Sequence, residues 1–116
     1  MKYLFILLLA LPLHAATLPA STGYVVSLNW LAPVSSPDPV AGYDIYRSVS
    51  MKNSFIELNT SLNISTSYID AALLYGISYD YYVTSVDAAG TQSDHSNTVT
   101  MQIPFVPYTP VVGVVK

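Results

Sequence analysis

The stretch that decides the predicted fold is LLYGISYDYYVTSVD, residues 73–87. A turn near Gly76 is followed by a run in which alternate residues from Tyr79 to Ser85 share one face. Aromatic and β-branched residues fit a pleated surface, and the run contains no proline, so the stretch predicts a central β-strand. Both faces carry apolar residues, which predicts that the outer face is partly covered or binds a partner.

The N-terminus has the pattern of a secretory signal peptide. Lys2 precedes an apolar run over residues 3–13, and the small residues Ala15 and Ala16 follow. The run is too short to span a bilayer. We expect cleavage after Ala15, with Ala16 as the alternative, so that residues 1–15 are lost and a secreted or periplasmic protein without a membrane insertion remains. A buried core helix is the other interpretation, and Pro12 argues against it.

Charge and cysteine content exclude several classes of function. Loss of Lys2 with the leader leaves three basic residues against seven acidic ones, a net charge of −4. Three scattered basic residues are too few to form a basic surface that binds nucleic acid or an anionic membrane. The absence of cysteine excludes a disulfide framework, a thiol nucleophile and a thiolate metal site, so stability has to come from the core.

Other segments also predict short strands. In residues 24–31, the alternation places Val26, Leu28 and Trp30 on one face. We expect further strands over residues 42–48, 55–59, 66–70 and 96–103, with Ile56 and Leu58 as the inward pair of the second. Residues 16–23 offer at most a brief first strand. No segment has a helical period, which predicts an antiparallel sandwich or barrel. Residues 104–116 contain three prolines and predict an extended tail or linker.

Five motifs occur in a fixed order. They are Val26-x-Leu28-x-Trp30, Gly42-Tyr43-x-Ile45-Tyr46-Arg47, Ser67-Tyr68-Ile69-Asp70, Leu73-x-x-Gly76-x-x-Tyr79-x-Tyr81-x-Val83, and Val86-Asp87-x-x-Gly90-x-x-Ser93 followed by Ser96-Asn97. Together they resemble a fibronectin type III domain over about residues 18–103. The resemblance implies an all-β fold, a seven-stranded antiparallel immunoglobulin-like sandwich over residues 16–103, with the first strand short or missing.

The resemblance also implies roles for individual residues. Trp30 would be the core aromatic of the second strand, and Leu73 and Tyr79 would form a tyrosine corner whose hydroxyl bonds backbone a few residues upstream. This chain has Tyr75 where the family often has proline. The expected core residues are Trp30, Tyr43, Tyr68, Leu73, Tyr79, Tyr81 and Val83. A missing first strand would expose a sheet edge, which we expect residues 111–115 or a partner's strand to fill.

We expect no catalytic, cofactor or metal site. Asp94, His95 and Ser96 have the residue types of a catalytic relay, but consecutive side chains diverge. With His14 lost in the leader, one histidine and no cysteine do not suffice for a zinc site. Asp87 and Asp94 flank a glycine-containing loop, yet the dense acidic run of a calcium loop is absent.

Tyr46 and Tyr82 are the candidate binding residues. Both point away from the core on strands that the resemblance places side by side, so they could stack on sugars or seat a protein. The alternative is that they only cover the sheet or pack against the tail. The sequence thus favours a non-enzymatic, monomeric, secreted module for protein or surface binding, adhesion or spacing. A carbohydrate-binding accessory module and a small hydrolase are the alternatives, and the partner, protein or polysaccharide, is unknown.

Overall fold

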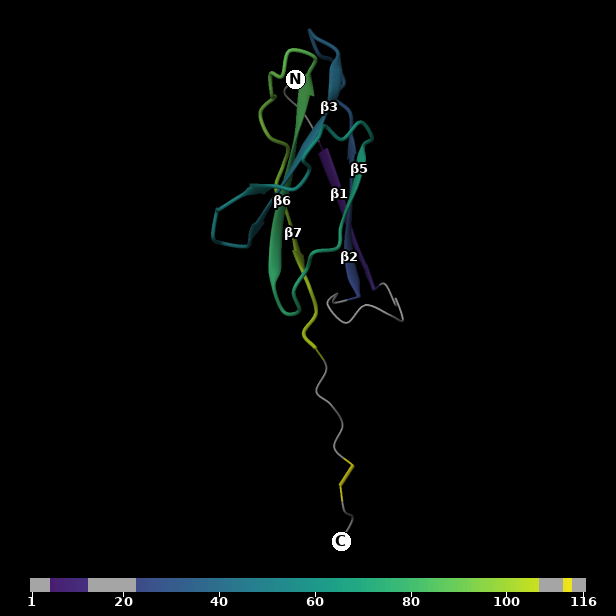
Figure 1. The fold of residues 1–116 in the computed structure, drawn as a ribbon, viewed down its shortest axis with the longest axis vertical. Coiled ribbons are helices and arrows are strands. Elements are labelled where there is room, and N and C mark those ends of the chain that lie inside the picture. Colours follow the sequence, from purple (N-terminus) through teal and green to yellow (C-terminus); the bar gives the residue numbers. More distant parts are fainter. Residues whose placement is uncertain (1–4, 13–22, 107–111, 114–116) are drawn as a thin grey trace.

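Two antiparallel sheets pack face to face in the computed structural model, which describes residues 5–12, 23–106 and 112–113 (Figure 1). The first sheet has the order β1–β2–β5, with β1 at Phe5–Pro12, β2 at Tyr24–Leu31 and β5 at Ser67–Asp70. The second has the order β4–β3–β6–β7, with β4 at Ile56–Glu57, β3 at Val40–Val49, β6 at Ser78–Asp87 and β7 at Val99–Gln102. The predicted all-β antiparallel sandwich is confirmed. No helix occurs among the residues that the structure describes, so none there is long and apolar enough to cross a membrane.

Strand β6 is the centre of the second sheet, as the alternation in its sequence predicts. It pairs with β3 from Tyr79 to Asp87 and with β7 from Ser78 to Tyr81. The inward residues Tyr79, Tyr81 and Val83 are buried, and Tyr82 lies half-buried on the opposite face. This tyrosine-rich run thus forms a strand that has a neighbour on each side and apolar groups on both faces.

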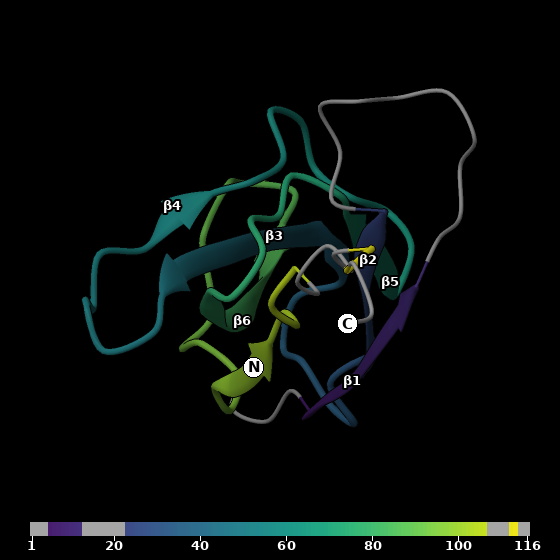
Figure 2. The same cartoon turned by 90° about the horizontal axis from the view of Figure 1, so that it is seen from below.

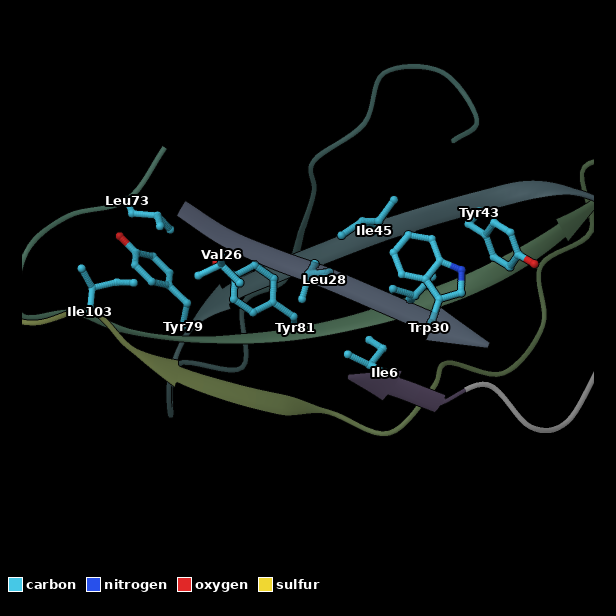
Figure 3. Packing of buried hydrophobic residues seen from close by; sticks show 11 residues of the cluster. Ile6, Val26, Leu28, Trp30, Tyr43, Ile45, Leu73, Tyr79, Tyr81 and Ile103 are labelled. Atoms are coloured by element: carbon cyan, nitrogen blue, oxygen red, sulfur yellow. The ribbon is translucent and has the colours of Figure 1, made fainter. Parts of the chain in front are cut away.

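The core lies between the sheets, and its residues come from alternate strand positions (Figure 3). The cluster contains Ile6, Val26, Leu28, Trp30, Tyr43, Ile45, Leu73, Tyr79, Tyr81, Val83 and Ile103. Tyr68 is half-buried against it. Figure 3 shows Leu73, Tyr79 and Ile103 together at one end and Trp30 beside Tyr43 at the other, where the two rings meet edge to face at 5.3 Å. The seven side chains expected in the core therefore belong to it or pack on it.

The first strand lies upstream of where the sequence predicts it. Phe5–Pro12 pairs with the whole of β2, from Phe5 opposite Leu31 to Pro12 opposite Tyr24. The first strand is thus neither short nor missing in this chain, and the apolar run is a strand rather than a core helix. The composition of an apolar run of this length is compatible with a leader and also with a strand. Residues 16–22, the cleavage position after Ala15 and most of the tail (107–111 and 114–116) lie outside the described residues.

Strand β4 is shorter than expected, and the prediction that Ile56 points inward is wrong. Ile56 is 54% exposed, whereas Leu58 packs on the core. The chain leaves the ladder early because Asn59 takes over the pairing of β3. The Ile45 amide donates to Asn59 Oδ1 at 2.8 Å, and Asn59 Nδ2 donates to the Tyr43 carbonyl at 3.0 Å. A side-chain amide thereby replaces a backbone partner at this edge.

Candidate functional site

Four rings gather on the outer face of the second sheet, and we call them the outer aromatic cluster: Tyr46, Phe55, Tyr82 and His95. Tyr46 and Tyr82 are register partners on β3 and β6, and each follows a residue of the core cluster, Ile45 or Tyr81, so that both face away from the core. Their ring centroids are 4.9 Å apart with an interplanar angle of 26°. Phe55 and His95 each lie 4.6 Å from the Tyr82 ring. The sheet thus brings the two predicted binding residues together and adds two that were not predicted.

The rings of the outer aromatic cluster mainly cover one another. Tyr46 and Tyr82 stack face on face rather than lying side by side in one plane, so one face of each ring is already used. The Tyr46 hydroxyl donates to Gln92 Oε1 at 3.1 Å, and Thr84 Oγ1 donates to the same oxygen at 3.1 Å. Burial, and then the neighbouring Tyr46, raise the pKa of the Tyr82 hydroxyl. This geometry favours sheet cover over a flat platform for a sugar ring.

A buried charge network joins the two sheets on the core-facing side of β6. Asp70 of β5 is 4% exposed. Arg47 Nη1 of β3 donates to both of its carboxylate oxygens, at 3.1 Å to Oδ1 and 2.8 Å to Oδ2. The Tyr81 hydroxyl donates to Asp70 Oδ2 at 2.8 Å. The Ala72 amide donates to Asp70 Oδ1 at 3.1 Å, and Arg47 Nη1 also donates to the Ala72 carbonyl at 2.9 Å. The carboxylate therefore has a partner on each oxygen.

Burial and the charges of Asp70 and Arg47 determine the pKa shifts within this network. Burial, followed by the charge and hydrogen bond of Asp70, raises the pKa of the Tyr81 hydroxyl. Burial lowers the pKa of Arg47, but the hydrogen bond and charge of Asp70 outweigh it and leave that pKa raised. The Arg47 guanidinium also lies 5.0 Å from the Tyr79 ring centre. Sequence reasoning missed this network, although Arg47 shares the parity of the inward residues Tyr43 and Ile45.

The corner geometry implied for Tyr79 is present. Leu73 and Tyr79 are buried, and the Leu74 amide donates to the Tyr79 hydroxyl at 3.0 Å, five residues upstream. The turn between them is formed by Gly76, whose φ of 74° lies in the left-handed region. A side chain at this position would also meet the Phe105 ring at 2.6 Å. Tyr75 in place of a proline therefore does not prevent the hydroxyl from reaching the backbone.

The candidate catalytic residues do not converge. Ser96 Oγ accepts the Val83 amide at 2.9 Å and donates to the Asn97 carbonyl at 2.8 Å, while His95 Nδ1 lies 2.6 Å from the Ser96 carbonyl oxygen. Asp87 Oδ1 accepts the amides of Ala89 and Thr91, both at 2.9 Å, and so holds the turn at Gly90. A hollow of about 250 Å³ beside this turn is lined by Asp38, Pro39, Asp87, Ala88 and Ala89.

Metal-ligating side chains are also dispersed among the described residues. In the parts of the chain that the structure describes, no group of three or more His, Cys, Asp or Glu side chains could hold a metal ion. The acidic side chains that are buried serve hydrogen bonds of the fold, as Asp70 and Asp87 show. Chemistry at these positions would have to displace bonds that hold strands and turns together.

Comparison with known proteins finds similarity to short parts of larger enzymes. No family model matches the chain. The amylopullulanase of Thermoanaerobacter thermohydrosulfuricus is 33% identical over 82 residues, which cover 71% of this chain and 5% of the enzyme. The amylopullulanase of Thermoanaerobacterium thermosulfurigenes is likewise 33% identical over 89 residues. The chain therefore spans about 5% of the length of the curated relatives it matches.

Solved structures share the sandwich. An Fn3-like protein from Clostridium thermocellum has a TM-score of 0.55 and 26% identity, covering 72% of this chain and 81% of that one. The β-1,2-glucanase from Parabacteroides distasonis has a TM-score of 0.56 and 25% identity, covering 73% of this chain and 11% of that one. The same sandwich thus occurs as most of a small protein and as a minor part of an enzyme.

Proposed function

Because this chain is a domain of the fibronectin type III fold, we propose that it is a secreted, non-catalytic module for protein or surface binding or for spacing. The observation that carries the proposal is the use made of its polar side chains. Asp70, Asp87 and Ser96, which have the chemistry of catalytic groups, each hold structural hydrogen bonds. Buried polar groups whose hydrogen bonds hold strands and turns support a fold rather than a reaction.

The relatives support an accessory role. The matched region is about 5% of the two amylopullulanases and 11% of the glucanase. A segment of that size is small beside the remainder of each enzyme, so the reaction named for the whole need not be carried by this part. The fold itself does not decide the function, because sandwiches of this kind host many roles.

Export is supported by the leader pattern of the sequence, with Lys2 before an apolar run and Ala15 and Ala16 after it. A negative net charge without cysteine is compatible with a role outside the cytoplasm that depends on the core alone.

The first experiment tests binding and catalysis with the purified protein. We would incubate it with cell-envelope preparations and with insoluble starch, and assay soluble starch and pullulan for release of reducing ends. If the proposal is correct, the protein is removed from solution by the envelope preparation or by neither material, and no reducing ends are released. Release that scales with protein concentration and is lost in Asp87→Asn would contradict the non-catalytic role.

Carbohydrate binding is a second candidate, because the outer aromatic cluster occurs in a chain whose relatives are an amylopullulanase and a β-1,2-glucanase. Its test compares depletion by insoluble starch and by β-1,2-glucan for the wild type and for Tyr46→Ala. Tyr75→Ala is the matched control, since Tyr75 is a partly exposed tyrosine outside the cluster. Depletion that only Tyr46→Ala loses would favour this candidate, and no depletion would leave the first proposal.

A further inference from the structure

We propose that the edge of β2 is an acceptor site for an extended apolar strand of a second exported protein, and that β1 fills this site only until the leader is removed. The inference rests on the proposed export. It concerns one side of the first sheet, where β1 is the outermost of the described strands and pairs with β2 (Figure 2).

The pairing that β1 makes defines the site. Eight consecutive residues of β1 lie opposite eight residues of β2 in antiparallel register. On its other side, β2 pairs with β5 over Val26–Asn29. Removal of β1 therefore turns β2 from a central strand into an edge whose N–H and C=O groups on one side lose their partners. Such an edge is a template for another strand.

The site also has an apolar position that sets what can bind. Ile6 is 9% exposed, belongs to the core cluster and lies opposite Trp30 in the register. Its amide donates to Asn97 Oδ1 at 3.1 Å, outside the β2 ladder. Figure 3 shows Ile6 against the β2 residues Leu28 and Trp30, at the margin of the core. An occupant thus needs an extended backbone and an apolar side chain opposite Trp30.

The sequence of β1 is that of a leader as well as of a strand. An edge strand of a sandwich needs apolar residues at alternate positions only, because the other face meets solvent. Phe5–Pro12 reads FILLLALP and is apolar at consecutive positions, as the core of a signal peptide is. The two uses exclude each other in time, because a segment that has been cleaved away cannot complete the sheet.

The chain's own tail fits the site less well than a separate strand. The tail begins beside the start of β2, since the Gly76 amide donates to the carbonyls of Ile103 and Pro104 at 3.1 and 3.0 Å, and the adjacent Tyr75 ring lies 6.1 Å from Tyr24. A segment running from there along β2 would pair parallel to it, opposite to β1. Further along, in the 111–115 segment expected as a possible occupant, Val112 is 99% exposed and a Cβ placed on Gly113 would meet no atom within 4 Å, so these two described residues do not lie on β2.

The test uses the full chain with a protease site placed between residues 13 and 22. The folded protein is cut, unfolded in guanidinium, freed of the small fragment, and refolded with a labelled peptide of the Phe5–Pro12 sequence carrying added terminal lysines. We expect one peptide bound per chain, a higher melting temperature and a blue shift in the emission of Trp30, the only tryptophan. The same peptide with Ile6→Lys is the control and should not be taken up.

Three results would overturn the inference. A cut chain that refolds and ignores the peptide has no acceptor edge, and a chain that no peptide restores cannot take its strand in trans. Uptake that appears only after residues 107–116 are deleted would identify the tail as the occupant. Export is scored separately by mass spectrometry of the N-terminus in the exported fraction, so an unprocessed leader would refute the proposed export without being confused with a failed exchange.

Discussion

The two sides of the first sheet are closed by different means. On the β5 side, a buried ion pair joins the sheets, with Asp70 bound to Arg47 and to the Tyr81 hydroxyl. On the β1 side, the described contacts are a backbone ladder to β2, the Ile6 side chain in the core, and the bond from the Ile6 amide to Asn97.

This difference determines what each side tolerates. Loss of one member of a buried ion pair leaves the other charge buried without compensation, which is costly. Loss of an edge strand leaves backbone groups that water can reach. The β5 side is therefore suited to permanent closure, and the β1 side to exchange. Substitutions on each side, and at the hydroxyl contacts nearby, should separate the two kinds of closure.

Asp70→Ala should have the largest effect. It removes the partner of Arg47 and of Tyr81 at once, and we expect a loss of about 3–5 kcal/mol in the free energy of unfolding. Urea denaturation measures it, with Asp38→Ala as the control because Asp38 is exposed and should stay within about 0.5 kcal/mol. A loss for Asp70→Ala as small as that of the control would show that the ion pair does not hold the sheets together.

Ile6→Ala tests the other side in the full chain. Truncation of a buried isoleucine typically costs about 2–5 kcal/mol, and we expect the lower end because Ile6 lies at the margin of the core. The same denaturation series measures it, with Val34→Ala on the surface as the control. A cost equal to that of Asp70→Ala would remove the contrast between the two sides.

Tyr79→Phe deletes only the hydroxyl that accepts the Leu74 amide. We expect a loss of about 1 kcal/mol, because Leu74 is 65% exposed and water can replace the bond. Thermal unfolding compares it with Tyr75→Phe. An unchanged melting temperature would mean that the corner is held by packing of Leu73 and the ring alone.

The smallest expected effect is a change in stability with pH, which should appear only in alkaline solution. Burial beside Asp70 raises the pKa of Tyr81 above its usual value of 10.0, so the folded protein keeps this proton more tightly than the unfolded chain. Its contribution to stability is complete below pH 10 and declines as the pH rises above it. The difference in unfolding free energy between wild type and Tyr81→Phe should therefore be flat from pH 7 to 9 and decrease above pH 10.

This difference cancels the other tyrosines with raised pKa values, Tyr43, Tyr68 and Tyr82, because both proteins contain them. A difference that stayed constant up to pH 11 would show that the Tyr81 hydroxyl titrates normally. The Tyr81 and Asp70 contact on the β5 side would then be weaker than its 2.8 Å distance implies.

Local periodicity predicted the parts of the fold that depend on a single strand. Alternation identified the inward residues Tyr79, Tyr81 and Val83 and the outward Tyr82, because strand geometry alone decides the face. The stacking of Tyr46 on Tyr82 required only that β3 and β6 be neighbours. Phe55 and His95 join them from a turn and a loop, and no periodic pattern reports where such segments fold back.

Other features depend on how the two sheets pack. The parity of Arg47 predicts an inward charge, but its pairing with Asp70 follows from the position of β5 relative to β3, which the sequence does not reveal. Ile56 has a strand-like pattern and pairs with Arg47, but it is 54% exposed because β4 lies at the edge of its sheet, a position that the local pattern does not reveal. The apolar run over residues 3–13 has the pattern of a leader, and its composition does not distinguish a leader from a strand such as β1.

The pairing of β1 with β2 also sets an order of events during synthesis. A hairpin forms in about 1–10 μs, far faster than the ribosome adds residues at roughly 5–20 per second, but an isolated hairpin is marginally stable in water. Strand β5, which flanks β2 on its other side, is made some forty residues later. Until it emerges, Phe5–Pro12 remains accessible to a targeting factor, and afterwards folding withdraws it. Slowing translation before residue 67 should therefore increase the fraction of chains that are exported.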